Sequence, residues 1–259
     1  MVTSRLNPQC FATIRLIATD MDGTLTCDRH FRPALLTWLE QLHKADIKVI
    51  IVTGRSAGWA SAIAHYFPVQ GVIAENGGVF CPSDRTVDTT APQFLCAIGN
   101  EQAHRRALAQ QFANLQTAYP QLQPAADNPY RRTDWTFDVA GLSQAEIQDL
   151  GDRCRAAGWD FTYSTVQCHI KLPGQAKSAG LQQVLRNHFP GIQPTEIVTI
   201  GDSPNDESLF NAERFPHTVG VANIQPYLAH LNHQPKYLTQ ASEAEGFGEL
   251  VAAILANQE

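Results

Sequence analysis

Apolar runs of strand length alternate with amphipathic helical patterns in the first third of the chain. Strands are expected at Ile14–Thr19, Ile47–Val52 and Val72–Ala74, and a helix begins at Pro33 with leucines along one stripe. Each strand ends in small or polar residues, as parallel strands do when a site lies along one edge of their sheet. The pattern predicts an α/β fold with a doubly wound, mostly parallel, Rossmann-like sheet.

The pattern changes between about Pro82 and Leu172, where strands with period two accompany helices. One helix is expected at Glu101–Leu115, and a capping-box sequence at Ser143–Glu146 opens another. Alternating strands with helices on one side describe an α+β module whose sheet has one uncovered face. We therefore expect an inserted cap domain. The expected boundaries are 1–84 and 172–259 for the core and 85–171 for the cap.

Alternating strand and helix patterns resume after Gly174. The elements expected there are a helix at Ser178–His188, strands at Ile197–Ile200, Val219–Val221 and Tyr237–Leu238, and a last helix around Glu249–Leu255.

Composition excludes some classes of partner. The 259 residues are 44% apolar and 17% charged with a net charge of −6, so we expect neither a nucleic-acid nor a membrane partner. No apolar stretch approaches the ~20 residues of a spanning helix. The first dozen residues lack a signal peptide's apolar segment, and the six cysteines form no Cys-x-x-Cys pair, which favours a cytoplasmic protein with reduced thiols. The oligomeric state is not predicted.

Asp20 and Asp22 follow the first strand and precede a turn at Gly23. Strand residues i and i+2 share a face, so the two carboxylates are expected to converge at the sheet edge. Close carboxylates repel unless a cation or a shared proton intervenes, which indicates a divalent metal or one ionised acid beside one protonated acid. The alternatives are an Asp-Gly turn with a helix cap, and a nucleophilic thiol at Cys27.

Three further segments carry polar residues at strand ends or helix starts, namely Thr53, Lys177 and the pair Asp202 and Asp206. Together with Asp-x-Asp-Gly-Thr at 20–24, they resemble in order and type the four motifs of the haloacid dehalogenase (HAD) superfamily of phosphotransferases. Segments 75–78 and 177–181, with the insertion, resemble the Cof-type cap subclass, IIB. The resemblance covers nearly the whole chain.

This resemblance implies a phosphatase that forms an aspartyl-phosphate. Asp20 would be the nucleophile and Asp22 the general acid and base, while Thr53 and Lys177 would hold the phosphoryl group. The subclass acts mostly on small phosphorylated metabolites, especially sugar phosphates, including sucrose-phosphate and mannosyl-phosphoglycerate types. A phosphosugar mutase of the same superfamily and a non-catalytic sugar-phosphate sensor are the alternatives.

The resemblance also implies Mg²⁺. Asp202 would bind the ion with the Asp20 carboxylate and the Asp22 carbonyl, and Asp206 would be a further or water-bridged ligand. Asn205 would be a hydrogen-bonding residue beside them.

Substrate contacts are expected at the rim of the site and on the polar face of the cap sheet. The predicted substrate-binding residues are Thr53, Gly54, Arg55, Asn76, Lys177, Asn205, His169 and Lys171. In 166–172, His169 and Lys171 share a face, and we expect them to contact the leaving group, with Arg131 or Arg132 as further candidates. The alternatives are a surface ion pair for Arg55 and an ordinary solvated sheet face for the cap residues.

Overall fold

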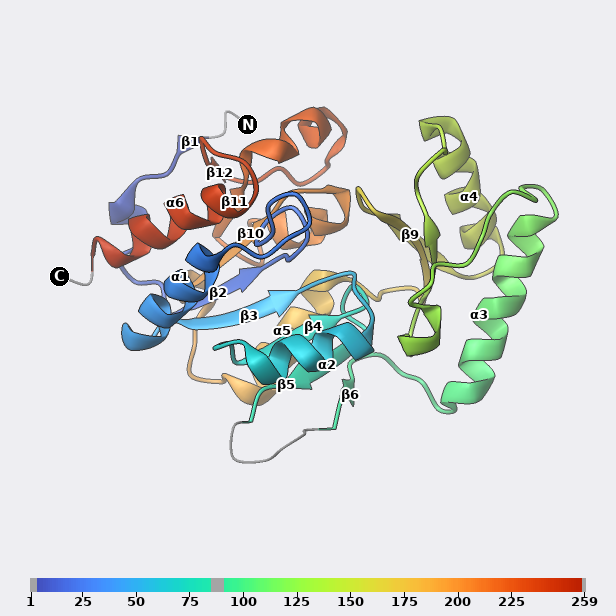
Figure 1. The fold of residues 1–259 in the computed structure, drawn as a ribbon, viewed down its shortest axis with the longest axis horizontal. Helices are drawn as coiled ribbons and strands as arrows, with labels where there is room; N and C mark the ends of the chain where they lie inside the picture. The colour runs from blue at the N-terminus through green and yellow to red at the C-terminus, as the bar shows by residue number, and fades with distance from the viewer. Residues whose placement is uncertain (1–3, 85–90, 258–259) are drawn as a thin grey trace.

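The computed structural model describes residues 4–84 and 91–257. A large sheet lies between two layers of helices, and a smaller sheet with two helices packs beside it (Figure 1). The strands of the large sheet, in spatial order, are β1 (Ser4–Arg5), β12 (Tyr237–Leu238), β11 (His217–Gly220), β10 (Ile197–Gly201), β2 (Leu16–Thr19), β3 (Lys48–Val52), β4 (Gly71–Ala74), β5 (Val79–Pro82) and β6 (Gln93–Phe94). All pairings are parallel except β4 with β5 and β5 with β6.

Both faces of this sheet are covered because successive strand residues point to opposite sides. One face carries Ile17 and Ile51 and packs against helices α1 (Pro33–Lys44), α2 (Ala57–Tyr66) and α6 (Glu243–Leu255). The other face carries Leu16 and Ile50 and packs against α5 (Lys177–His188) and the 3₁₀ segment η4 (Pro204–Phe210). The predicted α/β architecture is confirmed.

The order of the strands defines where a site is expected. From β2 the chain proceeds through β3 to β4, whereas from β10 it proceeds through β11 to β12 on the other side. The order in which the chain adds strands to the sheet therefore reverses between β2 and β10. These two strands are parallel neighbours, with Thr19 opposite Ile200. Ligands of open α/β sheets bind at the carboxyl ends of strands at such a switch point.

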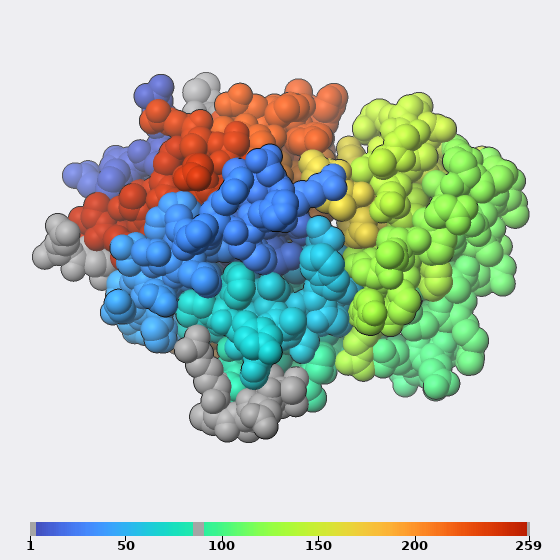
Figure 2. Space-filling model, viewed as in Figure 1, coloured from blue at the N-terminus to red at the C-terminus, as the bar shows by residue number. Residues whose placement is uncertain are grey.

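The smaller sheet belongs to a second unit, coloured green to yellow in Figure 2, which lies against the core. It contains β7 (Trp135–Asp138), β9 (Gln167–Lys171) and β8 (Asp160–Tyr163), all antiparallel. Helices α3 (Glu101–Gln116) and α4 (Gln144–Ala156) cover the face that carries Phe137, Cys168 and Ile170. The capping box of Ser143 and Glu146 opens α4 as predicted.

Some elements differ from the expectations. Strand β6 lies in the range predicted for the cap but pairs with β5 in the large sheet, because two residues are too few for a periodic pattern. The predicted boundary between 84 and 85 adjoins residues outside the described ranges. Strand β1 adds the N-terminal segment to the sheet, α6 begins at Glu243 rather than Glu249, and α2 and β5 were not predicted.

The remaining 3₁₀ segments are η1 (Pro8–Phe11), η2 (Asn128–Tyr130), η3 (Pro194–Glu196) and η5 (Ala222–His230). Within the described ranges, every helix is too short or too polar to cross a bilayer.

Candidate active site

The predicted catalytic residues meet at the carboxyl edge of the large sheet. Asp20 follows β2, Thr53 follows β3, Asp202 follows β10, and Lys177 is the first residue of α5. All four are buried, with at most 4% of each residue exposed. Residues that are far apart in the sequence are thus placed together by the ends of neighbouring parallel strands.

Lys177 joins two of the carboxylates. Its Nζ lies 2.5 Å from Asp20 Oδ1 and 2.6 Å from Asp206 Oδ1. Burial alone would lower the pKa of Lys177, but Asp20 and Asp206 together raise this pKa above its ordinary value. Burial also raises the pKa of Asp20 to about 7, although Lys177 opposes that rise. The ammonium group is therefore a fixed charge beside Asp20.

Asp20, Asp202 and Asp206 form an acidic cluster, in which one oxygen from each lies within 4.8 Å of the others. Burial, followed by the charges of Asp20 and Asp206, raises the pKa of Asp202. Asp202 Oδ1 is buried and has no hydrogen-bond partner among the described residues, while Oδ2 accepts from Asn223 Nδ2 at 2.9 Å. A hard divalent cation such as Mg²⁺ prefers this set of oxygen donors, so the residues present fit the predicted ion.

Asp206 has less capacity to bind a cation than its neighbours. Its Oδ1 accepts from Lys177, and its Oδ2 accepts from the backbone N–H groups of Asp202 and Ser203 at 3.0 and 3.1 Å. These bonds fix the turn after β10 and orient the carboxylate of Asp202. The contacts of Asp206 favour a positioning role over a direct ligand.

Mg²⁺ should stabilise the protein more at pH 8 than at pH 6. Burial raises the pKa of folded Asp20 to about 7, whereas unfolded Asp20 loses its proton near its ordinary pKa of 3.8. The metal-free protein thus loses stability as pH rises through this window, by up to about 1.4 kcal/mol per pH unit. A cation binds the deprotonated carboxylate and restores that loss, whereas protons compete with it at pH 6.

The measurement is the Mg²⁺-induced change in melting temperature at the two pH values. Asp152→Asn, on the exposed side of α4, is the control and should behave as wild type. Equal shifts at both pH values would contradict the expectation.

Asp22 faces Arg55 instead of the cluster. Arg55 Nε lies 2.8 Å from Asp22 Oδ2, and Arg55 Nη2 lies 2.6 Å from Asp22 Oδ1. The guanidinium carbon lies 4.6 Å from the centre of the Trp59 ring. An ion pair was the alternative expectation for Arg55, and the structure places that pair at the mouth of the site.

Three more predicted residues lie around the same edge. Thr53 Oγ1 accepts the Arg55 N–H at 3.1 Å, and Asn205 Nδ2 donates to Asn76 Oδ1 at 3.1 Å. Asn76 Nδ2 is buried without a hydrogen-bond partner among the described residues. A Cβ on Gly54 would lie 3.2 Å from a ring carbon of His169, so a glycine allows core and cap to approach closely here.

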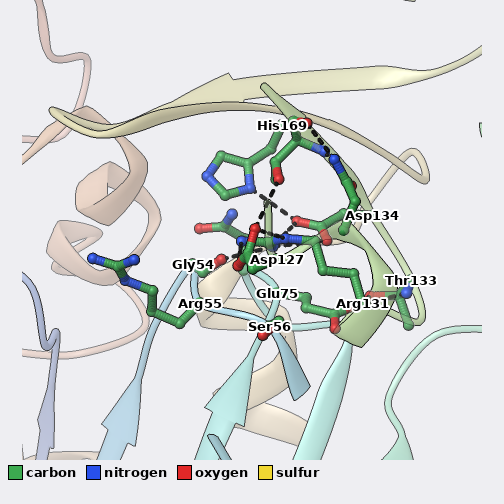
Figure 3. A network of polar contacts seen from close by, with 12 residues as sticks. Gly54, Arg55, Ser56, Glu75, Asp127, Arg131, Thr133, Asp134 and His169 are labelled. Carbon is green, nitrogen blue, oxygen red and sulfur yellow. Dashed lines mark hydrogen bonds and ion pairs between the residues drawn. The ribbon is translucent and has the colours of Figure 1, made fainter. Parts of the chain in front are cut away.

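A charged network joins the cap to the core (Figure 3). Arg131 is buried and pairs with Asp127 at 2.8 Å and Asp134 at 2.9 Å, and its Nη1 donates to the Gly54 carbonyl at 2.9 Å. Asp134 Oδ2 also lies 2.8 Å from His169 Nδ1. These partners occupy the guanidinium of Arg131 and place it between cap and core, and its contact with the leaving group stays a prediction.

The environment of His169 fixes its hydrogen-bonding state. Burial lowers the pKa of His169, so the ring is neutral near pH 7. Although burial raises the pKa of Asp134, Arg131 and His169 outweigh this effect and lower it, so this carboxylate is an acceptor. The His169 Nδ1 therefore donates to Asp134, and Nε2 is an acceptor.

Three other candidate residues do not line the pocket that contains Asp20 and Asp22. Lys171 Nζ bonds Asp160 at 2.7 Å and lines a neighbouring pocket with Lys177. Arg132 pairs with Glu101 at 2.6 Å and does not line that pocket, and its contact with the leaving group stays a prediction. Cys27 Sγ lies 3.8 Å from Arg32 Nη2 and does not line the pocket that Asp20 and Asp22 share.

Glu75 has a role that its sequence motif did not reveal. It is fully buried, and it accepts from the Ala57 N–H of the core at 2.9 Å and from the Thr133 N–H and Oγ1 at 2.6 and 2.7 Å. Gln175 Nε2 donates to the Glu75 carbonyl at 2.6 Å. These bonds join Glu75 of the core to Thr133 of the cap and to Gln175 in the segment that follows the cap, and only the three-dimensional contacts identify them.

The residues line a narrow pocket between the core and the cap, with about 20 Å³ of space for a water-sized molecule. Its lining consists of Asp20, Asp22, Gly54, Arg55, Ser164, Thr165, Val166, Gln167, His169, Ser203 and Asn205. The polar face of the cap sheet thus forms the roof of the site. The alternative expectation of a solvated face is wrong for His169, which is 1% exposed.

Solved structures with the same architecture define the class. A protein from Thermoplasma acidophilum superposes with a TM-score of 0.73 at 19% identity over 93% of this chain and 98% of that one. The sucrose-phosphatase of Synechocystis sp., solved with sucrose and phosphate, gives a TM-score of 0.66 at 18% identity over 96% and 98% of the two chains. A haloacid dehalogenase-like hydrolase from Bacteroides thetaiotaomicron gives 0.68 at 15% identity over 93% and 99%. The fold is therefore that of the haloacid dehalogenase hydrolases.

A family model described as sucrose-6F-phosphate phosphohydrolase matches residues 13–254, and the chain belongs to this family of phosphatases. Among curated relatives, a phosphoglycolate phosphatase of Methanothrix thermoacetophila is 30% identical over 243 residues, or 92% of this chain and 96% of the relative. That of Methanothermobacter thermautotrophicus is 30% identical over 250 residues, covering 93% and 99%.

Proposed function

We propose that the protein is a Mg²⁺-dependent phosphatase that hydrolyses small phosphorylated metabolites through an aspartyl-phosphate on Asp20. The observation that carries the proposal is the contact of Lys177 with Asp20 inside a buried acidic cluster that opens on the pocket. Phosphoryl transfer depends mainly on positioning and on neutralising the charge of the transferred group. This arrangement supplies both.

Asp20 is the proposed nucleophile. Lys177 holds one of its oxygens at 2.5 Å and thereby orients the carboxylate. The same ammonium group can attract the oxygens of a bound phosphoryl group, because it is a compact charge with three donors. Asp206 holds Lys177 in place from the other side at 2.6 Å.

Asp20, Asp202 and the Asp22 carbonyl would hold Mg²⁺. When bound, the ion would neutralise negative charge on the phosphoryl oxygens. The turn at Gly23 comes so close to Asp202 that a Cβ there would lie 2.3 Å from Oδ2. The glycine, with φ of +84°, therefore allows the loop after Asp22 to close on the metal-binding carboxylate.

Asp22 is the proposed general acid and base. It lines the pocket together with Asp20, where it would donate a proton to the leaving oxygen and accept one from water. The Thr53 hydroxyl, the backbone N–H of Gly54 and the amide of Asn205 are the proposed neutral ligands of the phosphoryl group. These groups orient the phosphate without adding charge.

The polarity of the pocket supports a small, polar substrate, because most of its lining side chains are charged or hydrogen-bonding. Several relatives are phosphoglycolate phosphatases, whereas the family model describes a sucrose-6F-phosphate phosphohydrolase. In line with these relatives, we propose a compact substrate such as 2-phosphoglycolate.

His169→Ala should raise KM about tenfold with a smaller effect on kcat, because the neutral ring is proposed to pack against the leaving group at the roof of the pocket. His169→Gln keeps a side chain of similar length there and should be less impaired. The kinetics would be measured on the best substrate, with exposed His43→Ala on α1 as the control. An unchanged KM in His169→Ala would reject this role.

The test of the function is a Mg²⁺-dependent assay on a panel of phosphorylated metabolites. Inorganic phosphate and the dephosphorylated compound should appear in equal amounts, and a chelator should stop the reaction. An isomeric phosphate ester without free phosphate would indicate a mutase. Binding without turnover would indicate a sensor.

A further inference from the structure

We propose that Arg55 selects substrates that carry a carboxylate, by exchanging its partner Asp22 for the carboxylate of the substrate. The inference rests on the proposed phosphatase function and specifies its substrate class. It begins from the ion pair at the mouth of the pocket, where both residues are partly accessible. The side chains of Arg55 and Asp22 are 17% and 23% exposed.

The pair uses every oxygen of the Asp22 carboxylate. Arg55 Nε and Nη2 each donate to a different oxygen, at 2.8 and 2.6 Å. Such a two-point pair is strong and directional. Both oxygens of this carboxylate are directed at Arg55, although Asp22 is proposed to act on the leaving group. Release of one oxygen would let Asp22 turn towards the leaving group.

A carboxylate on the substrate is a suitable replacement. It presents the same planar pair of oxygens to the guanidinium, so the exchange preserves both hydrogen bonds. The Trp59 ring, 4.6 Å from the guanidinium carbon, supports Arg55 from the side and is not consumed by the exchange. Binding of the correct substrate would thereby free Asp22.

The remaining charges of the pocket also favour this assignment. Among its lining residues, Asp20 and Asp22 are acidic, His169 is neutral, and Arg55 is the only Lys or Arg. Lys177 is not part of this lining and is held by two carboxylates. A second anionic group on the substrate would be repelled by both aspartates unless Arg55 received it. The His169 ring and Arg55 both line this pocket.

The test compares 2-phosphoglycolate with 2-hydroxyethyl phosphate, in which an alcohol replaces the carboxylate. The wild-type protein should prefer the acid. Arg55→Gln should lower kcat/KM for 2-phosphoglycolate about 50-fold, as expected for a lost charge-assisted pair. The kcat/KM for 2-hydroxyethyl phosphate should change less than about 3-fold. Arg55→Lys keeps the charge but lacks the two parallel N–H donors of the guanidinium, so the loss of kcat/KM for 2-phosphoglycolate should be intermediate.

The loss in Arg55→Gln should fall on KM more than on kcat, because the substrate carboxylate loses its partner while Asp22 no longer has an arginine that restrains it. Arg153→Gln is the matched control, since Arg153 pairs with Asp149 at 2.6 Å and lies over the Tyr119 ring on the surface of the cap. Denaturation of each variant would verify that it is folded. Equal losses on both esters would overturn the proposal and place Arg55 on the phosphate, as would a wild type that shows no preference.

Binding measurements separate this inference from the proposed function. Asp20→Asn, which lacks the nucleophile, should bind 2-phosphoglycolate more tightly than the alcohol, and adding Arg55→Gln should abolish the difference. Persistence of that difference in the double variant would overturn the role of Arg55. Absence of turnover in the wild type would reject the phosphatase function, while the binding comparison would still decide the selectivity.

Discussion

Asp20→Asn is expected to lower Mg²⁺-dependent phosphate release by about 10⁴-fold, the scale seen when a catalytic nucleophile is removed. An amide oxygen is a far weaker nucleophile than a carboxylate and forms no stable phosphoryl adduct. The variant also removes one charge from the partners of Lys177 and from the acidic cluster. Its kcat would be measured under saturating Mg²⁺ on the best substrate of the panel.

Asp138→Asn is a suitable control, because Asp138 is exposed at the end of β7 in the cap. It should retain the activity of the wild type. If Asp20→Asn retained more than about a tenth of the wild-type kcat while remaining folded, Asp20 would not be the nucleophile.

Lys177→Met is expected to destabilise the metal-free protein by about 3–5 kcal/mol at pH 8, as the loss of one partner from a buried ion pair does. Methionine has a similar length but leaves Asp20 and Asp206 without their shared cation. The acidic cluster would then lack its nearest positive charge. The free energy of unfolding would be measured by denaturant titration with and without Mg²⁺.

Mg²⁺ should recover part of this loss, because a divalent cation can neutralise the same carboxylates. The kcat of Lys177→Met should also fall, since the phosphoryl group loses a proposed ligand. Lys44→Met, at the exposed end of α1, is the control and should change stability by less than about 0.5 kcal/mol. A similarly small effect of Lys177→Met would contradict the role of the buried ammonium group.

The sequence predicted the parts of the site that depend on strand ends. Asp20 and Asp202 follow apolar runs long enough to indicate parallel strands, and neighbouring parallel strands bring their carboxyl ends together. The resemblance to known motifs then placed Lys177 beside them. Period two likewise indicated that His169 and Lys171 share a face of the cap sheet, although it could not show that this face is buried against the core.

The contacts between core and cap could not be predicted in the same way. The bond of Arg131 to the Gly54 carbonyl spans 77 positions, and that of Glu75 to Thr133 spans 58. Neither pair leaves a periodic signal, because each depends on how two separately folded sheets are placed. The ion pair of Arg55 and Asp22 lies within the core, after the neighbouring strands β3 and β2, and its 33-residue separation likewise leaves no periodic signal.

The most direct test is a single turnover with labelled substrate, quenched with acid before hydrolysis is complete, followed by mapping of the labelled peptide. A phosphoryl group on Asp20, with none in the Asp20→Asn protein, is the predicted result. A label on another residue, or phosphate release without any covalent label at every time sampled, would contradict the central claim that Asp20 attacks phosphorus.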